Sequence, residues 1–248
     1  MRKIFILFLF LSSIAAYAQV TVTPALPTAD EEITIVYDAT QGTTGLVGVS
    51  PVLMHAGVVL SGPAGVDWQN VKGEWGNPSS IGQMTSLGNN KWQIKITPRS
   101  YFGVADGIRI YRIGMVFRNA GPCGGYAEAS TPCKEGKTTS NGDFFVDIYE
   151  SNALSVNFTQ PTSFPLFKNQ GEQVSITANA SETANLTLKI NNVTVASAAG
   201  STTLSYTHTI TESSGVSDVV ISADDGNEVK TASFQYIVRS ATVNAARP

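Results

Sequence analysis

Short segments in which apolar and polar residues alternate recur along the chain, and turn-forming residues separate them. Clear examples are ITIVY (33–37), KWQIKI (91–96), VSITA (174–178) and LTLKI (186–190). A period of two is typical of β-strands that bury one face. After residue 18, no amphipathic stretch is long enough to predict a helix. The sequence therefore predicts an all-β protein.

The composition changes near residue 151, which indicates two domains within the 248 residues. All three tryptophans precede this point, and Thr, Ser, Ala and Asn dominate after it. In the second half, several short strands and a two-residue turn at Asn191 and Asn192 are typical of a small immunoglobulin-like sandwich. We therefore predict two β-sandwich domains in tandem, at 19–150 and 152–239, followed by a connector at 240–248.

The first 18 residues have the pattern of a cleaved signal peptide. Arg2 and Lys3 precede an apolar run at 4–14, and the small residues Ala16 and Ala18 stand where a signal peptidase cleaves. The run is shorter than the about 20 residues that a membrane span needs. No cysteine follows it, so a lipoprotein is not expected. We expect a mature protein that begins at Gln19, has no membrane span, and is secreted or held at the cell surface.

The chain has two cysteines, Cys123 and Cys133, in a stretch rich in Gly, Pro and Ser. In an oxidising compartment, two such residues pair and close the loop between them. The alternative is a reactive redox pair, but nine intervening residues are not the spacing of a redox motif. We therefore predict a structural disulfide.

Composition and motifs argue against several classes of function. Charged residues make up 14% of the chain and the net charge is −3, which does not favour nucleic acid as a partner. Two cysteines and two histidines lack the spacing of a zinc site, and no phosphate-binding or dinucleotide motif is present. The sequence therefore predicts no metal site and no cofactor.

The residues that could perform catalysis do not form a recognisable set. His55 and His208 fall in different predicted domains, and both lie within predicted strands, where packing is the commoner role. Neither belongs to a nucleophile elbow, and no pair of carboxylates stands within an aromatic cleft pattern. We predict no catalytic residue here, and a stand-alone hydrolase is the least favoured hypothesis.

The segment from 67 to 92 carries the strongest indication of a binding site. Trp68 and Trp75 lie in stretches rich in Gly, Asn, Pro and Ser, which predict loops. An exposed indole ring can cover the apolar face of a sugar while polar side chains bind its hydroxyls. The candidate ligand-binding residues are Trp68, Trp75, Asp67, Gln69, Asn70 and Asn77. The alternative for each of the two tryptophans is a plug at the end of the core, and Trp92 is expected to be buried.

Longer motifs in both halves resemble a known family. In the first half they are ITIVYDATQG (33–42), MHAG (54–57), the segment 68–76, MT (84–85), NKW (90–92), PRSYF (98–102) and GMVFRNA (114–120). In the second half they are ASE (180–182), LTLKIN (186–191) and LSYT (204–207). Together these motifs resemble the N-terminal, non-catalytic region of secreted bacterial alpha-amylases of glycoside hydrolase family 13.

This resemblance implies a function for each domain. Residues 19–150 would be a carbohydrate-binding-module-like sandwich that binds an α-glucan such as starch, and 152–239 would be a spacer. A catalytic barrel would follow in the same chain, so no catalytic carboxylate is carried over to these residues. The segment between Cys123 and Cys133 resembles an insertion relative to the family pattern. The alternative is a purely structural or interaction role for both sandwiches in a secreted or surface protein.

Overall fold

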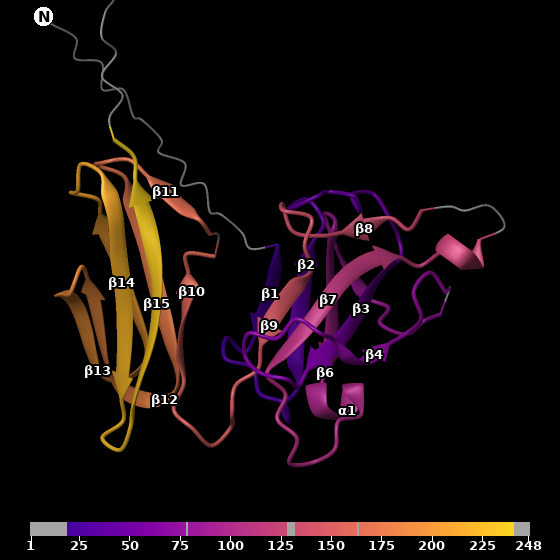
Figure 1. Ribbon diagram of the computed structural model, residues 1–248, viewed down its shortest axis with the longest axis horizontal. Coiled ribbons are helices and arrows are strands. Elements are labelled where there is room, and N and C mark those ends of the chain that lie inside the picture. Colours follow the sequence, from indigo (N-terminus) through magenta and orange to yellow (C-terminus); the bar gives the residue numbers. More distant parts are fainter. Residues whose placement is uncertain (1–18, 78, 128–131, 163, 241–248) are drawn as a thin grey trace, which may run out of the picture.

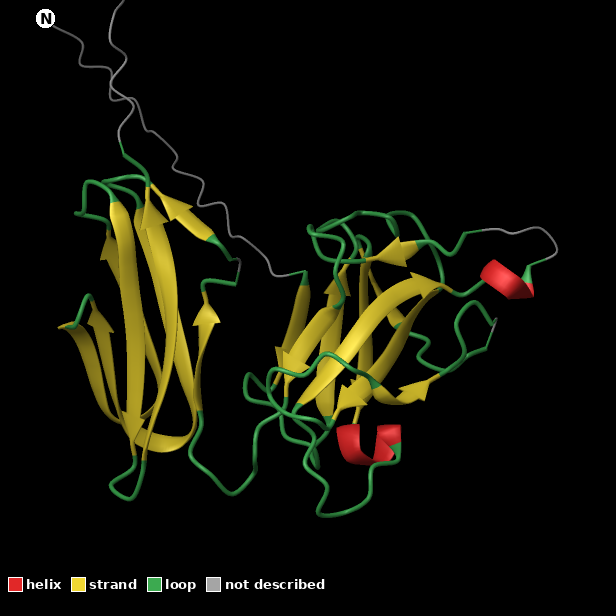
Figure 2. Ribbon diagram, in the orientation of Figure 1, coloured by secondary structure: helices red, strands yellow, loops and turns green. Residues whose placement is uncertain are grey.

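The computed structural model describes residues 19–77, 79–127, 132–162 and 164–240. Over these residues the chain is all-β, as predicted, with one short α-helix, α1 (Pro98–Phe102), and one 3₁₀ turn, η1 (Gly124–Tyr126). The strands form two sandwiches that lie beside each other (Figure 1, Figure 2). The predicted signal peptide at 1–18 and residues 241–248 of the predicted connector lie outside the described residues.

The first sandwich consists of two antiparallel sheets. One has the order β1 (Val20–Thr23), β2 (Ile33–Asp38), β6 (Lys91–Ile96) and β5 (Thr85–Gly88). The other has the order β4 (Gln69–Lys72), β3 (Val52–Val59), β7 (Arg112–Asn119) and β8 (Glu135–Gly136), and β9 (Phe144–Asp147) also pairs with β7. Strands β3 and β7 form the centre of this second sheet and pair without a shift in register.

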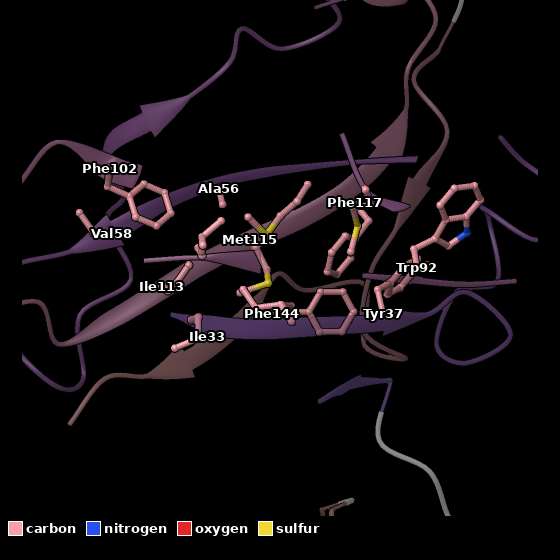
Figure 3. Packing of buried hydrophobic residues seen from close by; sticks show 14 of the residues in the cluster. Ile33, Tyr37, Ala56, Val58, Trp92, Phe102, Ile113, Met115, Phe117 and Phe144 are labelled. Atoms are coloured by element: carbon pink, nitrogen blue, oxygen red, sulfur yellow. The ribbon is translucent and has the colours of Figure 1, made fainter. Parts of the chain in front are cut away.

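The core of the first sandwich lies between these two sheets (Figure 3). Alternate residues of β2, from Ile33 to Tyr37, face inward and pack with Met115 and Phe117 of β7. The rings of Tyr37 and Phe117 stack with their centroids 4.0 Å apart. Trp92 is 6% exposed and belongs to this core, as predicted.

The second sandwich is built around two long strands, β12 (Gln173–Ile190) and β13 (Val193–Thr209). Their pairing register shifts at about the middle of β12, between Asn179 and Ala184. Before this shift β12 pairs with β10 (Val156–Gln160), and after it β12 pairs with β14 (Gly215–Asp224). Strand β15 (Val229–Val238) pairs with β14, and β11 (Leu166–Lys168) adds to β15 in parallel. This strand order is that of an immunoglobulin-like sandwich, as predicted.

Two local predictions for the second sandwich are also confirmed. Buried and more exposed positions alternate along β12, and Leu186, Leu188 and Ile190 occupy buried positions that face the core. Asn191 and Asn192 connect β12 to β13 with φ angles of 49° and 65°. Positive φ at both central residues defines the tight hairpin turn in which asparagine is favoured.

The connection between the sandwiches is short. The first core ends at Ile148 and the second begins at Leu154. Tyr149 lies between them and contacts both sides: it forms an isolated parallel bridge with Thr28, and its hydroxyl accepts a hydrogen bond of 2.5 Å from Asn157 Nδ2.

Candidate ligand-binding surface

The outer face of the sheet β4-β3-β7-β8 carries an aromatic layer formed by Trp68, His55 and Trp75. Trp68 lies closest to the backbone of this sheet. Gly57 of β3 and Gly114 of β7 lie opposite each other on this face. A Cβ atom added at Gly114 would stand 2.1 Å from Trp68 Nε1, and one added at Gly57 would stand 3.0 Å from Trp68 Cβ. The indole of Trp68 therefore lies directly on the backbone of the sheet, half-buried, because neither glycine has a side chain.

A methyl group at Gly114 would displace this indole. We expect Gly114→Ala to destabilise the first sandwich by about 1–3 kcal/mol, the usual cost of forcing extra atoms into a packed contact. Urea unfolding followed by tryptophan fluorescence measures this. Gly125→Ala is the matched control, since a Cβ there meets nothing within 4 Å. Equal stability of the two variants would contradict the proposed packing of Trp68.

His55 of β3 lies between the two tryptophans. Its ring centroid is 6.2 Å from that of Trp68 and 5.2 Å from that of Trp75, the latter in an edge-on arrangement. Burial lowers the pKa of His55, and the charge of Arg118 lowers it further. The imidazole therefore stays neutral near pH 7 and packs as part of the aromatic layer.

Trp75 follows β4 in a turn that holds its ring at the surface. The residue is 37% exposed, and the guanidinium carbon of Arg118 lies 5.9 Å from the ring centroid. Arg118 is itself 2% exposed and donates to the backbone oxygens of Asn77, at 2.6 Å, and Asn119, at 2.8 Å. The Cys123 N–H also donates to the Gly76 carbonyl at 3.1 Å. These contacts from β7 and the segment after it fix the turn.

A polar cluster stands next to Trp75 in the chain. Asn77 Nδ2 donates to Glu74 Oε2 at 3.2 Å. Hydrogen bonding, chiefly with Tyr126 and then with Asn77, lowers the pKa of Glu74. The bond to Glu74 correspondingly raises the pKa of the Tyr126 hydroxyl. Tyr126 is 44% exposed.

The remaining predicted site residues lie apart from this cluster. Residues 69–72 form the edge strand β4, so the prediction of a loop there is wrong. Asn70 adopts a φ of 52°, and its Nδ2 donates to the backbone oxygens of Phe102, at 3.2 Å, and Gly103, at 3.3 Å. Asn70 therefore ties β4 to the end of α1. Asp67 and Gln69 are exposed beside Trp68.

The predicted disulfide between Cys123 and Cys133 is present. Cys123 is buried, and the 3₁₀ turn η1 follows it at once and carries Tyr126. Sequence reasoning singled out Trp75 and Asn77 of this surface but missed Glu74, Arg118 and Tyr126. The one sequence signal for Tyr126 was its position inside the disulfide-closed loop.

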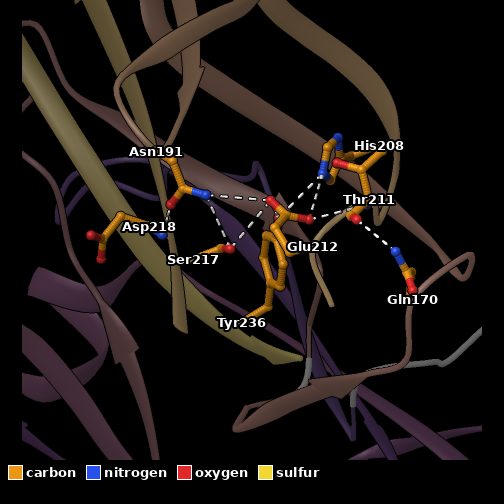
Figure 4. Close-up of polar contacts among 8 residues, drawn as sticks. All are labelled: Gln170, Asn191, His208, Thr211, Glu212, Ser217, Asp218 and Tyr236. Carbon is orange, nitrogen blue, oxygen red and sulfur yellow. Dashed lines mark hydrogen bonds and ion pairs between the residues drawn. The ribbon is translucent and has the colours of Figure 1, made fainter. Parts of the chain in front are cut away.

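A second polar cluster lies at one end of the second sandwich (Figure 4). Tyr236 is fully buried, and its hydroxyl donates to Glu212 Oε1 at 3.0 Å and lies 3.2 Å from His208 Nε2. Asn191 Nδ2 donates to Glu212 at 3.3 Å and to Ser217 Oγ at 3.2 Å. Burial, chiefly, raises the pKa of Tyr236 to about 12. The cluster joins the β12–β13 turn, β14, β15 and the segment after β13, so its role is to stabilise this end of the fold.

The described residues contain neither a metal-ligand cluster nor a membrane-spanning helix. No three side chains of His, Cys, Asp or Glu in the described part of the chain gather as they would around a metal ion. Within the same residues no helix has both the length and the apolar character to cross a membrane.

Solved structures with similar arrangements are β-sandwich proteins of low identity. Fibronectin(III)-like modules of Clostridium thermocellum CbhA are 21% identical, with 35% of this chain and 99% of that chain covered and a TM-score of 0.29. The BSP domain of a biofilm associated protein is 11% identical over 90% of this chain and 30% of that chain, with a TM-score of 0.36. Titin domains Z1Z2 in complex with telethonin are 12% identical over 91% and 100%, with a TM-score of 0.26.

A family model matches the first half of the chain. No curated protein matches the chain. Residues 20–122, which cover most of the first sandwich and end just before Cys123, match the family model of a domain of unknown function (DUF8578).

Proposed function

We propose that this chain is a non-catalytic region of a secreted starch-degrading enzyme. Its first sandwich would bind an α-glucan on the outer face of β4-β3-β7-β8, and its second sandwich would act as a spacer. The choice of α-glucan, and of an enzyme as the host protein, rests on the resemblance to the N-terminal region of alpha-amylases.

The observation that carries the binding proposal is the exposed, fixed ring of Trp75. The side chain lies outside the buried core cluster, yet Arg118, His55 and the Gly76–Cys123 contact hold it in one place. A ring that is ordered before binding loses little conformational entropy when a ligand stacks on it. Glu74 and Asn77 beside it offer the polar groups that sugar hydroxyls need.

The second sandwich suits the role of a spacer. Its most connected polar cluster, around Glu212 and Tyr236, is directed into the fold. A binding module on a short tether would keep an attached enzyme near an insoluble polymer and raise its effective concentration there.

Affinity electrophoresis of the full chain tests this proposal. We expect soluble starch in the gel to retard the protein, while hydroxyethyl cellulose and xylan leave its mobility unchanged. Retardation by all three polymers would contradict the choice of α-glucan. Unchanged mobility in all three would contradict glycan binding.

One observation favours a purely structural role as the second candidate. Several polar groups around the tryptophans are already bonded within the protein: Asn70 to the end of α1, Arg118 to backbone oxygens, and Asn77 to Glu74. In that case Trp68 and Trp75 would only cover the outer face of the sheet. The same gel decides between the two candidates.

A further inference from the structure

The side chain of Gln19 lies in a socket that joins the two sheets of the first sandwich. Its Nε2 donates to the backbone oxygens of Gln41, at 3.0 Å, and Lys137, at 2.9 Å. Gln41 follows β2 of one sheet, and Lys137 follows β8 of the other. The Gln19 backbone oxygen also accepts a hydrogen bond of 2.8 Å from the Asp38 N–H, so both its main chain and its side chain are fixed.

Gly42 forms the remaining wall of this socket. It has a φ of 65°, and a Cβ atom added there would overlap both the carboxamide of Gln19 and the backbone oxygen of Lys137. Thr43 holds Lys137 in place, because its N–H donates to the Lys137 oxygen at 3.2 Å and its Oγ1 accepts from the Lys137 N–H at 3.1 Å. The carboxamide therefore fits a space built from backbone, in which Nε2 makes the two hydrogen bonds that its two hydrogens allow.

Gln19 is also the residue at which the mature chain is predicted to begin, since the predicted signal peptidase site follows Ala18. A glutamine at the N-terminus can react with itself. Its α-amino nitrogen bonds to the side-chain Cδ, the Cδ–Nε2 bond breaks, and Nε2 leaves as ammonia with one proton from the amine. The product is the lactam pyroglutamate, which carries no α-amino charge, and the reaction needs no oxidant, reductant or co-reactant.

We propose that Gln19 is a modification site whose reactivity the fold controls: the cleaved chain cyclises to pyroglutamate while it is unfolded, and the folded first sandwich protects Gln19. The nitrogen that must leave is the one bound to Gln41 and Lys137, so cyclisation requires the carboxamide to break both bonds and leave the socket. The proposal rests on cleavage after Ala18 and is independent of glycan binding.

Intact-mass spectrometry of the exported chain tests the proposal. We expect a mature chain that begins at Gln19 with its carboxamide intact. At about pH 8, where a large share of α-amino groups is uncharged, it should lose one ammonia at least about tenfold more slowly in buffer than in guanidinium chloride. The physical reason is that two hydrogen bonds oppose the reaction only in the folded chain. Fragmentation of the N-terminal peptide assigns the loss to Gln19.

A pair of glycine variants isolates the socket from the rest of the fold. Gly42→Ala fills the socket, so the folded variant should cyclise within about threefold of the denatured rate. Gly48→Ala is the matched control, because Gly48 also has a positive φ, 72°, but a Cβ there meets nothing within 4 Å. It should cyclise at the rate of the folded parent.

Three results would overturn the proposal. These are equal cyclisation rates in the folded and the denatured parent, equal rates in the two folded glycine variants, and a mature chain that begins at a residue other than Gln19. If Gly42→Ala does not fold, the comparison of the folded with the denatured parent decides the matter.

Discussion

Trp75→Ala is expected to abolish retardation of the chain by soluble starch and to leave the fold intact. The exposed ring provides the stacking area, and its loss should weaken α-glucan binding by at least about tenfold, or ~1.4 kcal/mol. The side chain is 37% exposed and lies outside the buried core cluster, so its removal should cost the fold little. Affinity electrophoresis measures the retardation, and thermal unfolding of the same sample measures the stability.

Phe167→Ala is the matched control for this variant. Phe167 is 45% exposed on β11 and has the guanidinium carbon of Arg239 4.9 Å from its ring centroid. It therefore resembles Trp75 as an accessible ring beside a cation, but it lies on the other sandwich. Loss of retardation in both variants, or in neither, would contradict the assignment of the binding surface to Trp75.

Tyr236→Phe is expected to destabilise the second sandwich by about 1.5–3 kcal/mol, since it removes a hydrogen bond to a charged carboxylate. Tyr236 is fully buried and its hydroxyl lies 3.0 Å from Glu212 Oε1. Every tryptophan lies in the first half of the chain, so tryptophan fluorescence reports the first sandwich alone. Urea unfolding followed by far-ultraviolet circular dichroism should therefore shift, while the fluorescence transition stays in place. Tyr206→Phe, on β13, is the control, and an equal shift there would contradict the role of the buried hydroxyl.

The same cluster should make the second sandwich sensitive to acid. Burial by itself raises the pKa of Glu212, but hydrogen bonds from backbone N–H groups and Tyr236 outweigh it, so the net pKa is lowered. A carboxyl whose pKa is lowered by folding contributes stability that is fully present above its unfolded value, about 4.3, and is lost as the pH falls through the folded value. Glu212→Gln should therefore lose stability at pH 7 and show a flatter decline below about pH 5 than the parent. Parallel pH profiles of variant and parent would contradict this.

Much of the fold could be predicted because its signals are local. A period of two places Ile33 and Tyr37 on a buried face whatever else surrounds the strand, and it does the same for Leu186 and Leu188. The Asn191–Asn192 turn was also predictable, since asparagine tolerates the positive φ that a tight hairpin needs. What local patterns did not reveal is that β12 and β13 are each one long strand, whose mutual pairing shifts register between Asn179 and Ala184.

The candidate site was only partly predictable from the sequence. Its two tryptophans occupy different kinds of position, and only one of these positions was foreseeable. For Trp75, as for Trp68, the sequence predicts either an exposed binding ring in a loop or a plug of the core, and Trp75 is exposed in a turn. Trp68 was considered either as an exposed binding ring or as a plug of the core, and it instead lies on the outer face of a sheet. That position depends on Gly57 and Gly114, which come from two strands that only the register of β3 and β7 brings opposite each other.

The sequence by itself determined the all-β class, the tight turn at Asn191 and Asn192, the burial of Trp92 and the pairing of the two cysteines. Each of these follows from a short-range pattern of polarity, backbone preference or residue type. Only the tertiary structure decided that Arg118 is buried behind Trp75 and that the Cys123 N–H donates to the Gly76 carbonyl. The physical reason is that these contacts join residues far apart in the chain. Their energies depend on burial and on hydrogen-bond geometry, which exist only after the sheets and the disulfide-closed loop have come together.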